Sequence, residues 1–349
     1  MSKKQSWVFI TDWYPRETDN FNGIFIANWL RFLQDEADFT AIVWRTKQSK
    51  NQLLIHAAPF GKEIILETRS GIAGSWWQWI KYRKQIRNEL PQNYRLLLAP
   101  LPWSFVIKQF IFGKEKYILS EHQSVYFAPH FSKLSFWKKW LYQKGLDCSS
   151  EIIAVSPALK KQIEKIFPQA SIRVIPNRVE VQPKRNLKKQ KRIAIIGDVR
   201  DDVKGISQAL EWCSNDFPNF ELCLVGDGPD LPSIKNSFNS VSYQSTMMHD
   251  SLMDFIEESS VVVINSPFET FSILASEVQQ LGTYLLCRKN GGPEDFASSQ
   301  VIWFSNQEEF KFGANSISQR IEQNQHPIPF QNDLLKGERI IEMWKEVLQ

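Results

Sequence analysis

The sequence predicts two α/β domains in tandem, each with helices on both faces of a mostly parallel sheet. Three observations predict this class. The chain has 349 residues, which is enough for two domains of ordinary size. In both halves, short β-rich apolar runs alternate with amphipathic helical stretches, as in parallel α/β folds. Between the halves, residues 180–192 are polar, contain Pro183 and have no apolar face, so they are the best linker candidate.

In the first half, six short apolar runs predict strands, because they are rich in β-branched and aromatic residues. These runs are 6–11, 40–45, 94–99, 116–119, 151–155 and 172–175. Stretches with helical periodicity lie between them. The predicted helices are 24–35, 74–90, 103–112, 132–146 and 157–166. The last of these helices has Ser156 as its N-cap and Pro157 at its first position, a favoured pair at a helix start.

The second half repeats the same alternation after the linker. Its predicted strands are 192–196, 220–225, 260–264, 283–287 and 300–303. Its predicted helices are 205–214, 229–237, 249–258, 272–281 and 306–323. The final stretch, 333–349, has apolar residues at helical spacing and is predicted as one amphipathic helix with Asp333 as its N-cap.

The composition excludes several classes of protein. An apolar content of 43% excludes a disordered chain. The four cysteines lie far apart and form no CxxC pair, which excludes a disulfide scaffold or a zinc ribbon and fits a reducing compartment. The apolar run from Trp7 stops at Asp12, too short for a signal peptide, and no run approaches the ~18 apolar residues of a transmembrane helix. We therefore expect a cytoplasmic location.

The two halves carry opposite charge. Residues 1–192 have 32 basic and 15 acidic side chains, a balance of +17, whereas residues 193–349 have 10 and 23, a balance of −13. Ten of the 13 tryptophans lie in the first half. The asymmetry indicates different partners for the two domains, unless it reflects drift in surface composition. Because the basic residues are dispersed and no nucleic-acid motif is present, we expect no nucleic-acid partner.

The most informative segment is 265–294. After the strand at 260–264, Glu269 lies in a loop, and Glu277 lies about two turns into the helix that follows. Backbone N–H groups at this helix start favour an anion, and a carboxylate that accepts two vicinal hydroxyls is a common ribose ligand in α/β domains. Gly291 and Gly292 supply a tight turn after the next strand. The segment thus predicts a nucleotide site.

Five motifs in this order resemble those of the retaining glycosyltransferases of family 4, nucleotide-sugar enzymes with the GT-B fold. They are Ile153-Ala-Val-Ser156, Val174-Ile-Pro-Asn177, Val225-Gly-Asp-Gly-Pro229, Glu269-x7-Glu277 and Gly291-Gly-Pro-Glu294. The resemblance covers essentially the whole chain. It implies two Rossmann-like doubly wound domains facing across a cleft, with the C-terminal helix crossing back to the first domain. The implied domains are residues 1–178 with 333–349, which bind the acceptor, and residues 179–332, which bind the nucleotide-sugar.

The resemblance also implies roles at the donor site. Glu277 matches the glutamate that binds the ribose, and Glu269 matches the catalytic glutamate near the donor sugar and the diphosphate. Around them, Thr270, Phe271, Ser272 and Glu294 match donor-binding positions at the helix start and the following turn. Each glutamate also has an alternative that involves no ligand. Glu277 could be a solvated helix residue, and Glu269 could be an acid that complements the helix dipole.

The loop after the strand at 192–196 matches the diphosphate-binding loop of the family, with Gly197 at its start. The family usually has an arginine directly after this glycine and a lysine five residues later. Here Asp198 stands at the arginine position, and Lys204 comes one residue late. Lys204 is expected to bind the diphosphate, and Arg200 could replace the missing cation. Asp198 therefore keeps open an alternative, a catalytically inactive GT-B protein that binds nucleotide-sugars or acts as a partner subunit.

Two residues of the first half match acceptor-side positions. Gly23, preceded by Asn22, is expected to offer a bare backbone N–H near the transferred sugar, or else to be an ordinary turn glycine. His122 follows the strand at 116–119 and matches a histidine that lies over the reacting sugar, where it could orient a hydroxyl or stabilise developing charge. The other histidines show no ligand spacing, so we expect no metal site.

The implied reaction is transfer of a sugar from a nucleotide-sugar, of UDP or GDP type, to a glycan or lipid-linked glycan, with retention and without a metal or other cofactor. Cell-envelope or exported polysaccharide assembly is the expected process. Two aromatic and basic stretches, 76–87 and 131–144, would suit an anionic membrane surface at the inner face of the cell membrane, unless their aromatic residues belong to the core. A nucleotide-sugar epimerase of the same fold is a further alternative, for which Asp12 and Glu121 would be the acid/base candidates.

Overall fold

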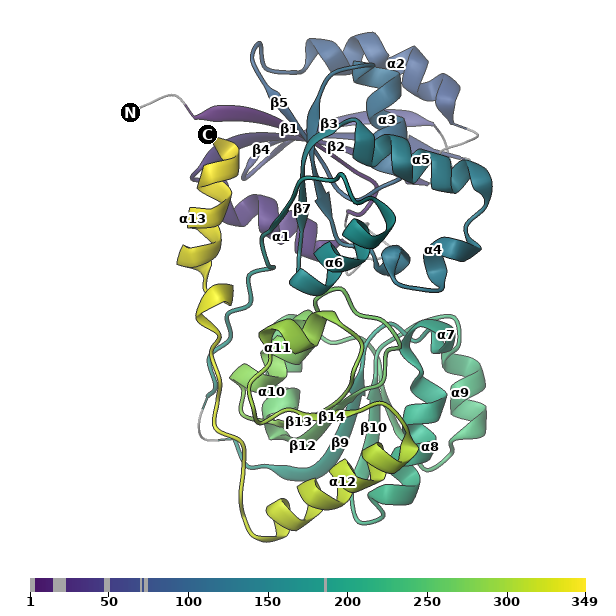
Figure 1. Cartoon of the computed structure of the whole chain (residues 1–349), viewed down its shortest axis with the longest axis vertical. Coiled ribbons are helices and arrows are strands. Elements are labelled where there is room, and N and C mark those ends of the chain that lie inside the picture. The colour runs from purple at the N-terminus through teal and green to yellow at the C-terminus, as the bar shows by residue number, and fades with distance from the viewer. Residues whose placement is uncertain (1–3, 15–22, 47–50, 70, 72–74, 185–186) are drawn as a thin grey trace. The chain divides into compact units, whose positions relative to one another are not determined.

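The computed structural model describes residues 4–14, 23–46, 51–69, 71, 75–184 and 187–349. The chain divides into two compact units, each an α/β domain, as the sequence predicts (Figure 1). The first unit comprises residues 1–176 and 340–349, and the second comprises residues 177–339. The sequence places these boundaries at 178 and 333. The C-terminal residues belong with the first unit, in agreement with the expected return of the last helix.

The first unit contains an eight-stranded sheet in the order β3-β4-β2-β1-β5-β6-β7-β8. All neighbouring strands are parallel except β3 and β4, which pair antiparallel. The strands are β1 (Gln5–Thr11), β2 (Ala37–Thr46), β3 (Gln52–Ala58), β4 (Gly61–Thr68), β5 (Arg95–Leu98), β6 (Tyr117–Glu121), β7 (Ser149–Ala154) and β8 (Ile172–Val174). The chain winds from β1 to one side and later to the other, so the switch point lies between β1 and β5.

The hairpin of β3 and β4 is the part of this sheet that the sequence analysis missed. β3 is the edge strand, and its residues are half-buried or exposed, so its apolar signal is diluted, whereas β4 lies between β3 and β2 and is largely buried. Gly61 opens β4 with φ 132°, where a Cβ atom would lie 2.4 Å from the carbonyl oxygen of Phe39. The close approach of β4 to β2 therefore requires glycine at this position.

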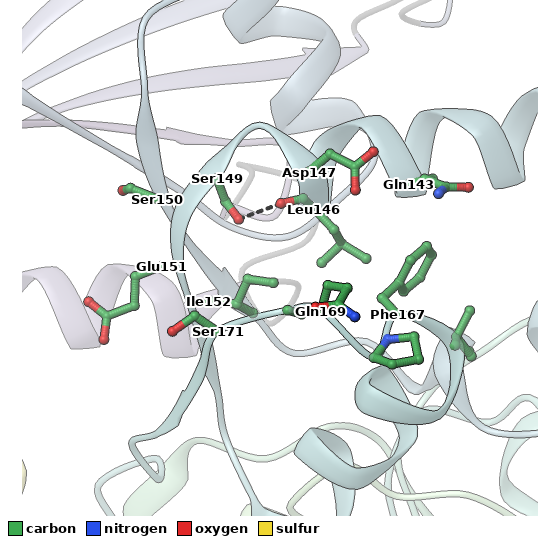
Figure 2. Close-up of a pocket in the computed structure, with 13 residues that line it drawn as sticks. Gln143, Leu146, Asp147, Ser149, Ser150, Glu151, Ile152, Phe167, Gln169 and Ser171 are labelled. Carbon is green, nitrogen blue, oxygen red and sulfur yellow. Dashed lines mark hydrogen bonds between the residues drawn. The ribbon is translucent and has the colours of Figure 1, made fainter.

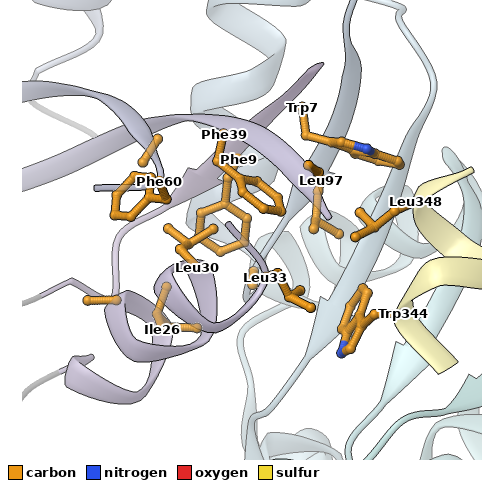
Figure 3. Close-up of a cluster of buried hydrophobic side chains, with 14 of the residues drawn as sticks. Trp7, Phe9, Ile26, Leu30, Leu33, Phe39, Phe60, Leu97, Trp344 and Leu348 are labelled. Carbon is orange, nitrogen blue, oxygen red and sulfur yellow. The ribbon is translucent and has the colours of Figure 1, made fainter. Parts of the chain in front are cut away.

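Helices α1 and α13 pack on one apolar layer of the first unit. The helices of the unit are α1 (Ile24–Phe32), α2 (Trp76–Asn88), α3 (Trp103–Phe112), α4 (His130–Lys133), α5 (Phe136–Asp147), α6 (Pro157–Ile166) and α13 (Gly337–Leu348), with a 3-10 turn, η2 (Ser124–Tyr126). Figure 3 shows Trp7 and Phe9 of β1, Leu30 of α1 and Trp344 of α13 in this core. Burial of such side chains stabilises the return of α13 to the first unit.

The second unit contains a six-stranded, fully parallel sheet in the order β11-β10-β9-β12-β13-β14. Its strands are β9 (Gln190–Ile196), β10 (Glu221–Val225), β11 (Ser242–Gln244), β12 (Ser259–Ile264), β13 (Tyr284–Arg288) and β14 (Ile302–Phe304). The short edge strand β11 is a further element that the sequence analysis missed. The winding reverses between β9 and β12, so ligands are expected beyond the carboxyl ends of these two strands.

Helices cover both faces of the second sheet. They are α7 (Asp201–Lys204), α8 (Ile206–Asp216), α9 (Leu231–Ser237), α10 (His249–Glu258), α11 (Ile273–Gln280) and α12 (Gln307–Glu322), with 3-10 turns η3 (Gly292–Phe296) and η4 (Asp333–Leu335). One apolar core joins α8 and α12 to the sheet, and a separate core joins α10 and α11 to it. The second core fixes the helix that carries Glu277.

Several predicted boundaries are wrong. The helix predicted at 132–146 is divided into α4 and α5, because Leu134 and Ser135 are extended. The last helix begins at Gly337, because Asn332 caps a separate 3-10 turn at Asp333–Leu335 and Lys336 is extended. The predicted linker at 180–192 is also shorter than expected, because β9 already begins at Gln190. Val181 is buried, and its backbone N–H donates to the side chain of Gln280, so the start of this segment is bound to α11.

Candidate functional site

The candidate donor site lies beyond β9 and β12, at the switch point of the second sheet. The loop after β9 leads into α7. Lys204, the last residue of α7, reaches the loop after β12. The Nζ atom of Lys204 lies 2.7 Å from Oε1 of Glu269. Their side chains are 30% and 16% exposed, respectively, so the ion pair is partly shielded from water. Two residues that were predicted from separate motifs are thus in direct contact.

Glu269 also joins the loop after β12 to the turn after β13. Its backbone pairs with Gly291 as an isolated parallel bridge, and its carbonyl oxygen accepts a hydrogen bond from the N–H of Gly292 at 2.9 Å. A Cβ atom on Gly292 would lie 2.2 Å from the carbonyl carbon of Thr270. The Gly-Gly turn is therefore required by the close approach of these two loops.

The start of α11 has an unusual backbone. Ser272 has φ 64° and ψ 88°, which is left-handed and uncommon for a residue other than glycine. Its hydroxyl accepts a hydrogen bond from the N–H of Ala275 and caps the helix. Just before it, Phe271 is buried against Phe296 of η3, with ring centroids 4.9 Å apart. Strain held by such packing is typical of functional loops. Thr270 lies between this turn and Glu269.

Glu277 lies in the second turn of α11 and is almost fully buried. Its Oε1 atom lies 2.9 Å from Nε2 of His249, the first residue of α10. The carboxylate side chain is 9% exposed and the imidazole 61%. The hydrogen bond to Glu277 raises the pKa of His249 above its usual 6.5. The sequence analysis gave His249 no role, because no spacing rule joins residues 28 positions apart.

The other residues predicted to bind the diphosphate are Arg200 and Gly197. Arg200 forms an ion pair with Asp198, at 2.6 Å between Nε and Oδ2, and both side chains are about half exposed. Gly197 has φ 147° and lies beside Gly226 of the Val225–Pro229 motif, where a Cβ atom would lie 1.9 Å from the carbonyl oxygen of Gly197. That motif therefore serves the contact between the loops after β9 and β10.

Glu294 is exposed, and its carboxylate accepts a hydrogen bond from the backbone N–H of Gly291 at 3.0 Å. This hydrogen bond stabilises the turn at Gly291 and the start of η3. Buried Asn265 is a further residue that the sequence analysis missed. It follows β12, and its side chain donates to the carbonyl oxygen of Gly205 at 2.8 Å and accepts from Arg288 at 3.3 Å. Asn265 therefore joins the loop after β12 to Gly205 and to the end of β13 in the candidate site.

In the first unit, β6 ends at Glu121, and His122 follows it directly, close to the switch point of that sheet. Glu121 is fully buried and accepts hydrogen bonds from three backbone N–H groups and from the hydroxyl of Tyr126. Burial raises its pKa to about 7, although these hydrogen bonds oppose the rise. Burial lowers the pKa of His122 to about 4, so its imidazole is neutral at neutral pH. Nε2 of His122 lies 3.0 Å from the hydroxyl of Ser120.

Helix α1 approaches the same end of the sheet. The ring of Phe25 lies 5.2 Å from that of His122. Gly23 precedes α1 with φ 74°, and a Cβ atom there would lie 2.4 Å from the backbone of Trp13. Gly23 and His122 are thus brought to the same edge of the first sheet, whereas Asn22 lies outside the described residues. Asp12 lies near the end of β1 in this unit.

A cavity of about 440 Å³ lies elsewhere in the first unit. Figure 2 shows Ser149, Ile152, Phe167 and Ser171 among the residues that line it. These residues belong to the starts of β7 and β8 and the end of α6, at the amino edge of the sheet. The cavity therefore lies at the edge opposite to Glu121 and His122.

Across the described residues, no group of three or more histidine, cysteine, aspartate or glutamate side chains is arranged to hold a metal ion. In the same part of the chain, each helix is too short or too polar to span a bilayer.

Two family models match the chain in succession. Glycosyltransferase Family 4 matches residues 25–182, and Glycosyl transferases group 1 matches residues 177–326. A search of curated protein sequences finds no significant match.

Solved structures share the fold over the whole chain at low sequence identity. Sucrose-phosphate synthase from Thermosynechococcus elongatus has a TM-score of 0.73 at 15% identity and covers 99% of this chain and 96% of its own. Anabaena Alr3699/HepE in complex with UDP has a TM-score of 0.68 at 13% identity, with 99% of each chain covered. An α,α-trehalose-phosphate synthase (UDP-forming) from Burkholderia vietnamiensis has 0.67 at 10%, also with 99% of each covered.

Proposed function

The chain belongs to the GT-B glycosyltransferases of the family 4 and group 1 type, and from this premise we propose that it transfers a sugar from a nucleotide-sugar to a glycan or lipid-linked glycan with retention of configuration. Assembly of a cell-envelope or exported polysaccharide is the proposed process. UDP is the first nucleotide to test, because the Anabaena protein binds UDP. The reaction proceeds without a resident metal or other cofactor in this proposal.

One observation carries the proposal: Lys204 meets Glu269 at the switch point of the second sheet, directly before the helix that carries Glu277. A cation beside a helix start suits a diphosphate, and a buried carboxylate on that helix suits a ribose. In this proposal Glu277 accepts the ribose hydroxyls. Lys204 leaves Glu269 and pairs with the diphosphate, and the N-terminus of α11 adds to the positive field.

The chemical step we propose is attack on the same face of the sugar as the leaving group. The bond from C1 to the phosphate oxygen breaks, and its electron pair stays on the phosphate. The acceptor hydroxyl forms the new C1–O bond and passes its proton to that phosphate oxygen. Lys204 stabilises the charge that develops on the diphosphate, and Glu269 faces the donor sugar.

On the acceptor side we assign the first unit, with Gly23 and His122 as its contributors. The pKa of His122 is about 4, so its imidazole is neutral and has one N–H donor and one acceptor, which Ser120 and a sugar hydroxyl would share because Nε2 already lies 3.0 Å from the Ser120 hydroxyl. A neutral ring is suited to orienting a hydroxyl and does not supply a permanent charge.

The test is calorimetric titration of the purified chain with UDP-glucose, GDP-mannose and ADP-glucose, with Glu277→Ala as the matched variant. We expect one of the three nucleotide-sugars to bind. Glu277→Ala should weaken that binding at least tenfold, because a carboxylate that accepts two hydroxyls is lost. Failure of all three to bind, or equal binding by the variant, contradicts the proposal.

The pairing of Arg200 with Asp198 favours a second candidate function, a catalytically inactive protein that binds nucleotide-sugars. With its guanidinium held by Asp198, Arg200 adds less charge to the diphosphate site. Hydrolysis of the bound donor separates the two candidates. Slow release of free sugar, above the rate of a Glu269→Gln variant, supports the enzyme, whereas tight binding without any release supports the inactive protein.

We also propose that the first unit docks on an anionic membrane, which would bring it to a lipid-linked acceptor at the inner face. Trp77 of α2 is 62% exposed, and Phe136 and Trp140 of α5 are 85% and 51% exposed. By contrast, Trp79 and Tyr142 of the same helices are buried, so the core explains only part of the aromatic content. Residues 76–88 and 130–146 each contain four basic and no acidic side chains.

Trp77 and Phe136 lie on the first turns of α2 and α5, and Trp140 lies on the second turn of α5. Helix α3 connects them, since it packs on α2 and its Trp103 ring lies 6.3 Å from that of Trp137. Aromatic anchors with basic neighbours suit anionic headgroups, at about 1 kcal/mol per cation. Flotation with vesicles of phosphatidylglycerol tests this proposal, with Trp77→Ser/Trp140→Ser as the weakened variant. Absence of flotation at low salt contradicts it.

A further inference from the structure

His249 contacts the carboxylate to which we assign the ribose. The imidazole comes from the first turn of α10, and the carboxylate comes from the second turn of α11. Nε2 of His249 and Oε1 of Glu277 lie 2.9 Å apart, a normal hydrogen-bond distance. Both helices are held by one apolar core that includes Phe255, Ala275 and Val278. The contact is therefore set by packed elements and not by a mobile loop.

The surroundings of His249 are acidic. Glu277 faces it from α11, and Asp250 lies beside it on α10, with 3.8 Å between Nδ1 and Oδ1. The hydrogen bond to Glu277 is the main cause of its raised pKa, and the negative charges of Glu277 and Asp250 add to it, whereas partial burial opposes it. The imidazole is thus more readily protonated here than in water.

We propose that His249 is a positioning residue of the donor site, which holds Oε1 of Glu277 so that the other lone pairs of the carboxylate face the ribose hydroxyls. This inference rests on the proposed function. A carboxylate oxygen has two lone pairs, so Oε1 accepts from His249 and remains able to accept from a hydroxyl. Glu277 is then pre-oriented, and less conformational freedom is lost when the nucleotide binds.

Protonation of His249 also changes the charge that an incoming nucleotide meets. An imidazolium offsets the negative charge of Glu277 beside an anionic diphosphate, whereas a neutral ring does not. Because the pKa of His249 is raised in the fold, the charged form is fully present below its usual 6.5 and is lost as the pH rises through the raised value. Nucleotide affinity should therefore fall as the pH rises through this window.

The experiment titrates the full chain with UDP-glucose and with its 2′-deoxyribose analogue at about pH 6 and about pH 8. Neither the diphosphate nor the uracil ring of UDP-glucose titrates appreciably in this range, so a change in affinity reports on the protein. For His249→Ala we expect about three- to tenfold weaker UDP-glucose binding at the lower pH, a small effect because the imidazole is exposed. The loss should shrink to less than about twofold with the deoxy analogue, since a hydroxyl partner is missing.

Two further variants separate positioning from a general structural effect. His249→Gln keeps an N–H donor without the charge, so it should restore binding at the higher pH and show no pH dependence. His130→Ala removes an exposed histidine of α4 in the first unit and should leave the profile unchanged.

Equal losses for both ribose forms, or a wild-type affinity that does not change with pH, would overturn the inference while leaving the proposed function standing. If wild-type protein binds none of UDP-glucose, GDP-mannose and ADP-glucose, the proposed function and this inference fail together.

Discussion

Replacement of Lys204 by alanine should weaken binding of a nucleoside diphosphate and slightly destabilise the second unit. The ammonium group makes a charge-assisted hydrogen bond with Glu269, and we assign it to the diphosphate when a nucleotide binds. Such a bond contributes about 1.5–3 kcal/mol, or about ten- to 150-fold in Kd. Because the side chain is 30% exposed and must give up Glu269 first, we expect the low end, roughly tenfold.

The partner substitution should act in the opposite direction. Glu269→Gln removes the carboxylate that competes for Lys204 and repels the diphosphate, so UDP should bind as tightly as to wild type or more tightly. Transfer of the sugar should fall, because Glu269 faces the donor in the proposed step. The ion pair itself should contribute about 1 kcal/mol or less to unfolding, since it is only partly buried.

Calorimetric titration with UDP and urea unfolding measure the two effects separately. Lys235→Ala is the matched control, because it removes an exposed lysine from α9 of the same unit. Equal affinity of the Lys204→Ala and Lys235→Ala variants for UDP would refute the assignment of Lys204. Weaker binding by Glu269→Gln would refute the idea that the two side chains compete.

Three further predictions concern stability. Gly292→Ala should cost about 1–3 kcal/mol in urea unfolding, because its Cβ would lie 2.2 Å from the backbone of Thr270; wild-type stability would contradict the claimed close approach. Trp344→Ala should cost about 3–5 kcal/mol, since its ring is buried and lies 4.6 Å from that of Trp29; a loss below about 1 kcal/mol would mean that α13 is not docked. The raised pKa of Glu121, about 7, means that its contribution is greatest below 4.5 and declines as the pH rises through 7. Melting temperatures should therefore favour Glu121→Gln over wild type increasingly with pH, and a constant difference would argue against the raised value.

The parallel strands and their helices could be predicted because their signals are local. The run at 260–264 is buried throughout as β12, and the helix with Ser156 and Pro157 begins where its cap and proline indicate. The edge strand β3 could not be predicted in this way, because a strand that is half in water lacks a clear apolar pattern. β4 is buried over its last five residues, and the prediction overlooked its apolar run. The start of the last helix could not be predicted from Asp333, because a residue that favours helix caps also opens a 3-10 turn.

The residues of the candidate site could also be predicted only where the signal lies within one segment. Glu269 and Glu277 follow from a spacing within one segment, and the structure places them on the loop and the helix that this spacing indicates. The contacts of these two glutamates with Lys204 and His249 join residues 65 and 28 positions apart. Such contacts depend on how β9, β12 and α10 are arranged, and no periodicity in the sequence encodes that arrangement.

The most direct measurement is a crystal structure of the chain with a bound nucleotide-sugar. We expect the ribose hydroxyls to lie within hydrogen-bonding distance of the Glu277 carboxylate and Nζ of Lys204 to contact the diphosphate. A nucleoside bound away from the start of α11, with Glu277 still paired only with His249, would contradict it.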